Sequence, residues 1–304
     1  MTLQQLRQVL TIAESNSMNE AAKKLFVSQP NLSATVREVE EELGITVFMR
    51  NNRGITVTAE GEEFLGYAKQ VVEQYHLLEN RYLNVESKKK FSVSMQHYSF
   101  AVKAFVQLAK EVGMDEYEFA VHETKTKEVI DNVKNLKSEI GVLYLSDFNE
   151  KVLRKLFKEC DIEFKELFTC NTYVYLWKKH PLAGQKEITL DDLQEYPCLT
   201  FEQGVNNSFY YAEEMMSTYE YKRVIKADDR ATMLNLMVGL NGFTLCSGII
   251  SEDLNGDDYA AIPLKESEIM HIGYIKHKGT KLSKLGEIYI DALKLSLIHI
   301  SEPT

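Results

Sequence analysis

The fold of the N-terminal part is decided by residues 17–44, which read SMNEAAKKLFVSQPNLSATVREVEEELG. Ser17 followed three residues later by Glu20 is a capping-box pattern, and it predicts a short helix that ends near Leu25. The next two residues, 26–27, are too few for anything except a tight turn. This part of the stretch therefore predicts a short helix that leads directly into a turn.

A second helix is predicted to follow the turn. Ser28 is its expected N-cap, and Pro30 then falls in the first turn, where a missing backbone N–H costs nothing. Gly44 is typical of the residue that ends such a helix. One apolar stripe runs along the helix, formed by Leu32, Val36, Val39 and Leu43. Two helices joined in this way form a helix-turn-helix, and the side opposite the stripe is expected to face outward.

The outward side of residues 28–37 carries small hydrogen-bonding groups and one arginine, which can read base edges and bind phosphate in a major groove. Residues 47–50 and 55–58 are predicted to form two short strands around a turn-forming tetrad. This wing adds two arginines suited to phosphate or minor-groove contacts. The predicted DNA contacts are Ser28, Gln29, Pro30, Asn31, Ser33, Ala34, Thr35, Arg37, Arg50 and Arg53.

Residues 58–87 change to the pattern of one long helix, in which apolar side chains recur at alternating spacings of four and three. About 30 residues give a rod of roughly 45 Å, which needs a partner along its length. Burial on the chain's own domain is one reading, and we favour pairing with a second copy. The predicted dimerisation residues are Phe64, Ala68, Val71, Tyr75, Leu78 and Tyr82.

Residues 88–295 alternate between strand and helix patterns, which predicts an α/β domain with a mostly parallel sheet. Residues 140–145 are a continuous apolar run, typical of a buried parallel strand, and residues 167–176 are expected to form another strand. About 200 residues of this pattern are more than a domain with a single sheet usually contains, so two sub-domains are expected. Residues 296–304 follow the last helical pattern abruptly, and we interpret them as an appended, non-native tail.

The composition excludes several classes of protein. The chain has 35 Lys and Arg against 45 Asp and Glu, and a formal charge of −10 is unsuited to coating nucleic acid through a bulk positive field. No run of 18 apolar residues and no secretory pattern occur, so no membrane span or export is expected. Four well-separated cysteines fit a reducing cytoplasm. No metal-binding or catalytic spacing occurs, so neither a metal site nor an enzyme is expected.

The chain resembles the LysR-type transcriptional regulators in the order and spacing of its motifs. The residues that carry the resemblance are AAKKLFVSQPNLS at 21–33, VEEELG at 39–44, VFMR at 47–50 and TAEG at 58–61. Two departures lie on the outward half of the second helix. Many members carry Arg where this chain has Ala34, and Ala where it has Glu38, so the base preference is expected to be unusual.

The resemblance implies an α/β chain whose N-terminal domain, residues 1–57, is an all-α winged helix-turn-helix. Residues 58–87 would form a linker helix that makes a dimer, and two dimers would form a tetramer. Residues 88–295 would adopt a periplasmic-binding-protein-like fold of two α/β sub-domains, which the chain crosses near residues 161–168 and 265–272. The implied boundaries are about 91–163 with 270–295 for sub-domain I, and about 164–269 for sub-domain II.

The resemblance also implies the partners of the chain. They are double-stranded promoter DNA, RNA polymerase, and a small-molecule effector that lies between the sub-domains and changes the contacts with the other two. No cofactor, metal, catalytic residue or membrane is implied, and the place of action is the cytoplasm.

Side chains at the carboxyl ends of predicted strands are the candidates for effector binding, because open α/β sheets bind ligands there. Amides and hydroxyls of residues 96–99 precede a helix, where they can bind a carboxylate. The alternative is that such hydroxyls are ordinary helix caps. The predicted effector contacts are His97, Tyr98, Ser99, Thr124, Thr126, Thr200, Phe201 and Gln203.

Segments 94–98, 138–145 and 229–232 are similar to a branch of the family tied to cysteine and methionine supply. That similarity suggests an amino-acid precursor, such as an O-acylated serine, as the effector. Two other functions stay open. The α/β body alone would permit a solute-binding protein without a DNA function, against which residues 1–60 argue. An enzyme with an accessory DNA-binding domain is the other, although no nucleophile–base spacing supports it.

Overall fold

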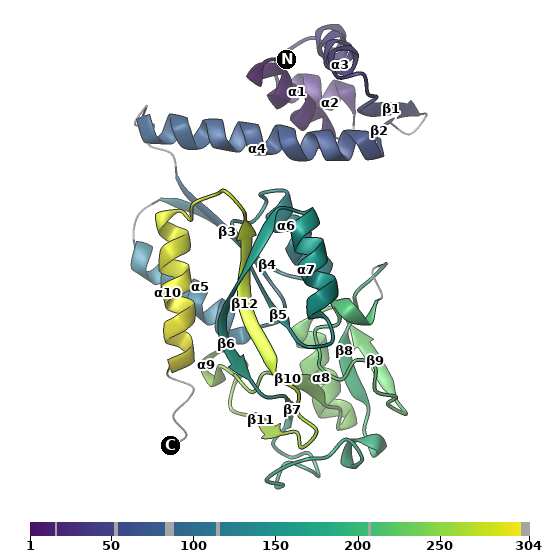
Figure 1. The fold of residues 1–304 in the computed structure, drawn as a ribbon, viewed down its shortest axis with the longest axis vertical. Coiled ribbons are helices and arrows are strands. Elements are labelled where there is room, and N and C mark those ends of the chain that lie inside the picture. Colours follow the sequence, from purple (N-terminus) through teal and green to yellow (C-terminus); the bar gives the residue numbers. More distant parts are fainter. Residues whose placement is uncertain (16, 52–53, 83–87, 114–115, 206–207, 299–304) are drawn as a thin grey trace. The chain divides into compact units, whose positions relative to one another are not determined.

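The computed structural model describes residues 1–15, 17–51, 54–82, 88–113, 116–205 and 208–298 (Figure 1). The chain divides into two compact units, residues 1–87 and 88–304. Across the described residues, every helix is too short or too polar to cross a lipid bilayer.

The first unit is a winged helix-turn-helix followed by a long helix. Its elements are α1 (Leu3–Ala13), α2 (Met18–Lys24), α3 (Gln29–Leu43), β1 (Phe48–Asn51), β2 (Gly54–Val57) and α4 (Ala59–Tyr82). Strands β1 and β2 form an antiparallel hairpin. The unit therefore has the order of elements expected from the sequence.

The predicted ends of α2 and α3 are confirmed. The Ser17 hydroxyl accepts a hydrogen bond from the backbone N–H of Glu20, and the Ser28 hydroxyl accepts one from Asn31, so both serines are N-caps. Gly44 ends α3 with a φ of +69°, the left-handed conformation that favours glycine. These boundaries follow from local chemistry alone.

The apolar stripe of α3 packs inward as predicted, except at its end. Leu32, Val36 and Val39 are buried in one cluster with residues of α1 and the wing. Leu43 was expected to join them, but 37% of it is exposed. The expectation is wrong there because α3 ends at Leu43, beyond the elements that cover the stripe.

Helix α4 has two different apolar faces. Ala68 is buried against Leu6 of α1, and Phe64 packs beside it. This contradicts the prediction that both face a second copy, because a heptad pattern does not reveal which helix covers it. Val71 and Leu78 are 51% and 55% exposed, and they lie on the face that α1 leaves uncovered.

Tyr75 lies between these two faces. The Arg7 guanidinium of α1 sits 5.2 Å from the centre of its ring, and Arg7 also pairs with Glu79 at 3.4 Å. The described part of α4 ends at Tyr82, whose side chain lies outside the description, as do residues 83–87 of the predicted linker.

The second unit contains a five-stranded mixed sheet, a three-stranded antiparallel sheet and a two-stranded parallel sheet, with their covering helices. Its elements are β3 (Lys89–Met95), α5 (Ser99–Val112), β4 (Tyr117–Glu123), α6 (Thr126–Lys134), β5 (Ile140–Leu145), α7 (Glu150–Glu159), β6 (Ile162–Cys170), β7 (Tyr173–Trp177), η1 (Asp192–Glu195), β8 (Cys198–Phe201), η2 (Phe209–Tyr211), β9 (Val224–Ala227), α8 (Arg230–Leu240), β10 (Thr244–Cys246), α9 (Glu252–Asn255), β11 (Tyr259–Pro263), β12 (Met270–His277) and α10 (Lys284–Ile298).

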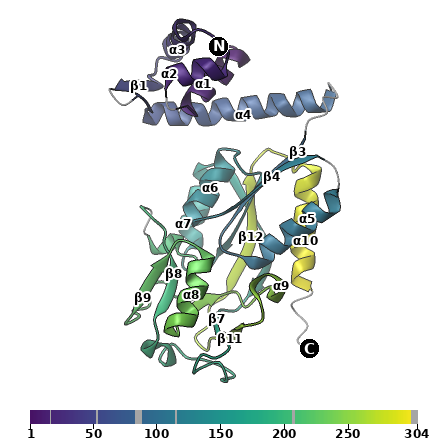
Figure 2. The same cartoon turned by 180° about the vertical axis from the view of Figure 1, so that it is seen from behind.

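Sub-domain I is built on a sheet of strand order β4-β3-β5-β12-β6. Helices α6 and α7 cover one face and α5 and α10 the other (Figures 1 and 2). Side chains of β5 alternate between the two cores, so that Val142 joins the α5 and α10 side and Leu143 the α6 and α7 side. The continuous apolar run at 140–145 is thus a fully buried strand, as predicted.

The expectation of a mostly parallel sheet holds for sub-domain I, where only β12 runs against the other four strands, and is wrong for the three-stranded sheet of sub-domain II. In sub-domain I, β3 pairs in parallel with β4 and β5, but β12 lies antiparallel to both β5 and β6. In sub-domain II, β10, β7 and β11 are antiparallel, while β8 and β9 are parallel. In sub-domain I the cause is topological: β12 returns from sub-domain II and enters the first sheet running in the opposite direction.

The predicted strand at 167–176 is two strands that belong to different sheets. Strand β6 pairs with β12 up to Cys170, and β7 begins the second sheet at Tyr173. The first crossing therefore lies at residues 171–172, later than the predicted 161–168. The Thr172 hydroxyl and backbone N–H bond to Glu268 and Ser267 at 3.0 and 2.7 Å, so the two crossings lie side by side.

The C-terminal helix is longer than predicted. Helix α10 continues to Ile298, and Ser296 is buried within it, so the predicted tail at 296–304 begins inside a helix. Residues 299–304 lie outside the described residues.

Candidate functional site

The predicted DNA contacts on α3 form a partly exposed surface at its N-terminal half. Ser28, Pro30, Asn31 and Arg37 are exposed, and Gln29, Ala34 and Thr35 are half-buried. Arg37 forms no ion pair with any side chain that the structure describes. An unpaired guanidinium beside small polar groups is suited to base edges or phosphates.

Ser33 does not belong to this surface. It is 8% exposed, and its hydroxyl accepts a hydrogen bond from Nε2 of Gln29 at 2.8 Å. In the free chain the predicted DNA contact Ser33 is thus not on the exposed surface, because position 33 faces the side of α3 that packs inward. Its hydroxyl instead helps to orient the amide of Gln29.

The wing is held to α3 by a carboxylate that sequence reasoning missed. Oε1 of Glu40 accepts the backbone N–H groups of Val47 and Phe48 at 2.7 and 3.0 Å. These bonds fix the start of β1 relative to the predicted reading helix. Of the two wing arginines, Arg50 lies on β1 with its side chain outside the description, and Arg53 lies outside the described residues.

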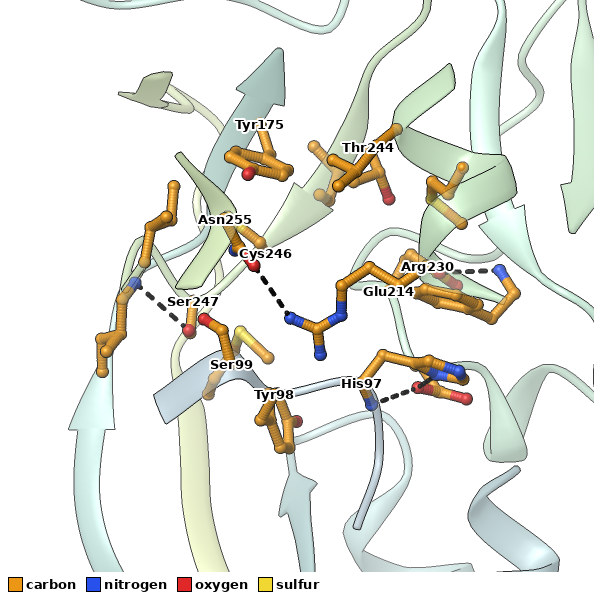
Figure 3. Close-up of a pocket in the computed structure, with 18 residues that line it drawn as sticks. His97, Tyr98, Ser99, Tyr175, Glu214, Arg230, Thr244, Cys246, Ser247 and Asn255 are labelled. Atoms are coloured by element: carbon orange, nitrogen blue, oxygen red, sulfur yellow. Dashed lines mark hydrogen bonds and ion pairs between the residues drawn. The ribbon is translucent and has the colours of Figure 1, made fainter. Parts of the chain in front are cut away.

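A cavity of about 90 Å³ lies between the two sub-domains of the second unit (Figure 3). Sub-domain I contributes the end of β3 and the start of α5, and sub-domain II contributes β7, α8, β10 and the segments that follow β8 and β10. The lining residues are His97, Tyr98, Ser99, Tyr175, Phe201, Glu213, Glu214, Arg230, Met233, Leu234, Thr244, Leu245, Cys246, Ser247, Ile249, Ile250, Asn255 and Met270.

Arg230 is the cationic group of the cavity. It is the first residue of α8, and Figure 3 shows its guanidinium reaching into the middle of the space. One nitrogen pairs with Glu123 at the end of β4, and another lies 3.5 Å from Oδ1 of Asn255. Arg230 therefore connects α8 of sub-domain II to β4 of sub-domain I.

Hydroxyl groups surround Arg230. The Thr244 hydroxyl is buried and has no hydrogen-bond partner among the described residues, and the Tyr175 hydroxyl is buried beside Asn255. Ser99 accepts a hydrogen bond from the N–H of Ser251 at 3.3 Å, which leaves its hydroxyl proton to donate. A buried hydroxyl without a partner costs about 1–3 kcal/mol, so a polar ligand that reaches Thr244 would be favoured.

Glu213 forms the acidic side of the cavity and was missed by the sequence analysis. Its Oε2 accepts the backbone N–H and ring Nδ1 of His97 at 3.0 and 2.7 Å, and its Oε1 accepts Nε2 of Gln203 at 3.0 Å. The ring of His97 also stacks on Phe201, with centroids 3.5 Å apart. His97 thus joins the two sub-domains as well as lining the cavity.

Glu214 has a different environment from its neighbour. Burial, and after it the nearby Glu213, raise its pKa to about 8, against the opposing effect of backbone hydrogen bonds such as that from the N–H of Phe201 at 2.8 Å. Glu214 therefore keeps its proton well into the neutral range.

The predicted effector contacts divide into two groups. His97, Tyr98, Ser99 and Phe201 line the cavity. Thr124, Thr126, Thr200 and Gln203 do not. The Thr124 hydroxyl donates to the side chain of Glu128 in the first turn of α6 at 2.5 Å, but the N-cap of α6 is Lys125 and no side chain caps the helix, so Thr124 is not a helix cap either.

Thr126 and Gln203 bond to each other across the sub-domain boundary. The backbone N–H of Thr126 donates to Oε1 of Gln203 at 3.1 Å, and the Thr126 hydroxyl accepts Nε2 of Gln96 at 2.6 Å. Lys125 also pairs with Asp228 at 3.3 Å. These residues tie the sub-domains together beside the cavity.

The rule that effector contacts follow the carboxyl ends of strands, which gave the other candidates, would also have identified Arg230. It follows the carboxyl end of β9, and its neighbour Asp229 caps α8 by accepting the N–H of Thr232 at 2.8 Å. Glu213 and Glu214 lie in an irregular segment with no periodic pattern, so the sequence carried no signal for them.

In the parts of the chain that are described, no three His, Cys, Asp or Glu side chains come close enough to share a metal ion.

Two family models match the chain. Residues 3–62 match the bacterial regulatory helix-turn-helix protein, lysR family, and residues 114–296 match the LysR substrate binding domain. The chain is similar to HTH-type transcriptional regulator CysL of Bacillus subtilis, at 25% identity over 95% of both chains. It is also similar to transcriptional dual regulator GltC of the same organism, at 30% identity over 67% of this chain and 66% of the relative.

Solved structures show the same fold at lower sequence identity. Full-length OxyR from Pseudomonas aeruginosa superposes with a TM-score of 0.70 at 19% identity, covering 97% of this chain and 95% of that one. CbnR, a LysR family transcriptional regulator, superposes with a TM-score of 0.59 at 17% identity, covering 97% and 99%. Together with the two matched domains, these findings show that the chain belongs to the LysR family of DNA-binding transcriptional regulators.

Proposed function

We propose that the chain binds promoter DNA through α3 and the wing, pairs as a dimer or tetramer through α4, and responds to a small anionic effector in the cavity. It would act in the cytoplasm on transcription by RNA polymerase, with no catalytic step and no cofactor. The observation that carries the effector part is the guanidinium of Arg230 in the middle of a largely apolar space.

The lining favours a small carboxylate with a short apolar body. Arg230 can hold a carboxylate with two parallel hydrogen bonds, and the hydroxyls of Ser99 and Thr244 can add more. Met233, Leu245 and other apolar side chains form most of the remaining wall. The cavity volume of about 90 Å³ restricts the ligand to a small molecule.

The acidic side of the cavity supports the narrower hypothesis of an amino-acid precursor. Glu214 lines the same space as Arg230, and a ligand ammonium beside it would favour its ionised form. A molecule with a carboxylate at one end and an ammonium near it, such as an O-acylated serine, therefore matches both charged groups.

A thermal-shift screen of the full chain tests the effector proposal. Short carboxylates, amino acids and O-acetylserine are the probes, and a bound ligand raises the melting temperature by mass action. We expect Arg230→Gln to abolish the shift. Arg223→Gln, an exposed arginine of the same sub-domain, should keep it. A shift of wild-type size in Arg230→Gln would overturn the assignment.

DNA binding is tested by gel shift on the DNA upstream of the chain's own gene, at a stated moderate salt concentration because phosphate contacts dominate affinity. We expect specific retardation that changes when a ligand found in the thermal screen is added. Absence of specific binding with and without that ligand would contradict the regulator function.

A further inference from the structure

Phe26, in the turn between α2 and α3, has two unfavourable properties. It is 96% exposed, so its ring gains nothing from burial inside the chain. Its φ is +54°, the left-handed conformation that side chains with a Cβ rarely adopt. Packing among the described residues does not cover the ring, so its compensation is expected from something that binds.

The hydrogen bonds of the turn explain why position 26 is left-handed. The N–H of Phe26 donates to the carbonyl of Lys23 at 3.2 Å, and the N–H of Val27 donates to Ala22 at 3.1 Å. This is the Schellman arrangement, in which the residue after the helix cap is usually glycine. The turn therefore favours Gly or Asn at this position, and the chain has an exposed phenylalanine instead.

Position 26 adjoins the predicted DNA-reading surface. It lies two residues before Ser28, the exposed N-cap of α3, and a helix-turn-helix places the N-terminus of its second helix in the major groove. Lys23, also exposed, lies in the last turn of α2. A phenyl ring at this position is suited to an apolar group of DNA, and the nearby lysine is suited to the phosphate beside that group.

We propose that Phe26 contacts duplex DNA through an apolar surface at the edge of the major groove, the C5-methyl group of a thymine or the deoxyribose next to it. Phe26 is then a specificity-determining residue that the free chain holds exposed. Apolar contact with the thymine methyl is one of the recognised ways in which the major groove is read. This inference rests on the DNA binding proposed above.

Two substitutions separate DNA contact from folding, because only one of them is expected to raise stability while it weakens DNA binding. Phe26→Asn suits the left-handed conformation but removes the apolar group, whereas Phe26→Leu keeps an apolar group and the unfavourable backbone. We expect the Asn variant to melt at a higher temperature than wild type and to bind DNA roughly tenfold more weakly. The Leu variant should melt close to wild type and keep most of the affinity.

Affinity is measured by fluorescence anisotropy on a duplex that the wild-type chain binds specifically, at several salt concentrations. The salt dependence should stay unchanged in Phe26→Asn, because no charge is removed, while Lys23→Gln should reduce it. Replacing each thymine in turn by deoxyuridine then identifies the group contacted. If Phe26 contacts a thymine methyl group, removal of that methyl at one position weakens the binding of the wild-type chain and leaves the binding of Phe26→Asn unchanged. If Phe26 contacts a deoxyribose, no thymine replacement has this effect.

Wild-type affinity in Phe26→Asn would overturn the proposal, and so would an Asn variant that binds better than the Leu variant. Unchanged DNA affinity combined with reduced transcription by RNA polymerase in vitro would also overturn it, in favour of a protein contact. A wild-type chain that binds no duplex would instead contradict the proposed function, which distinguishes the two failures.

Discussion

Among single residues, Arg37 is the exposed cation on the outward face of α3, and it has no described ion-pair partner. We expect Arg37→Ala to weaken specific DNA binding by about 1–3 kcal/mol if the guanidinium reads a base. The folding of the domain should change little, because the side chain is exposed. Anisotropy titration of a specific duplex at fixed salt measures the effect.

Glu41→Ala is the matched control for Arg37. Glu41 is exposed on the same outward side of α3, one turn nearer the C-terminus, where the helix is expected to leave the groove. Removal of its negative charge should leave the affinity equal or slightly higher. An Arg37→Ala variant that binds like wild type would remove Arg37 from the contact surface.

Glu214 should make the stability of the second unit depend on pH. In the unfolded chain its carboxyl group ionises near 4.5, but in the folded chain burial raises its pKa to about 8. The folded state therefore holds a proton that the unfolded state releases. The contribution of this group is fully present below about pH 4.5 and is lost as the pH rises toward 8.

We expect Glu214→Gln to reduce the fall in melting temperature between about pH 5 and pH 8.5. Glu220→Gln, at an exposed position in the same sub-domain, should keep the wild-type fall. Thermal unfolding monitored by circular dichroism across this range measures both. Identical pH profiles for Glu214→Gln and wild type would show that Glu214 ionises freely.

At the scale of elements, α4 is the helix whose role depends on its surroundings. Val71 and Leu78 form an exposed apolar face, while Ala68 on the neighbouring face is already covered by α1. We expect Val71→Lys, alone or with Leu78→Lys, to reduce the oligomer mass on a sizing column coupled to light scattering. The physical reason is that each lysine would have to be buried between two apolar helices.

Glu73→Lys is the control for α4, because it adds the same side chain on the opposite, polar face of the helix. It should leave the mass unchanged. If Val71→Lys also keeps the wild-type mass, the exposed face of α4 is not the pairing surface. A large substitution at Ala68 should instead lower the melting temperature, since that position packs inside the chain.

At the scale of the whole molecule, the two units have separate cores. Leu32 belongs to the core of residues 1–87, and Leu143 to the core of sub-domain I in the second unit. We expect calorimetry to resolve two unfolding transitions. Leu32→Ala should lower one of them and Leu143→Ala the other, each by the equivalent of about 2–5 kcal/mol. One transition that both substitutions lower equally would contradict the independence of the units.

The local features of the chain could be predicted because their causes lie within a few residues. The Ser17 and Ser28 caps, the stop at Gly44 and the apolar side of α3 depend on hydrogen bonds and periodicity inside one short stretch. The family resemblance rests on motifs within residues 21–61, so the sequence predicts the winged helix-turn-helix and, through the resemblance, the effector domain.

The remaining features were settled by contacts between segments that are far apart along the chain. The cavity unites His97, Tyr175, Glu214 and Arg230 from four separate elements or loops, and no local pattern relates them. Which face of α4 is covered depends on α1, and the mixed sheet depends on where β12 returns. Hydrophobic periodicity predicts that a side chain is buried, but the partner that buries it is determined by the tertiary packing of the chain.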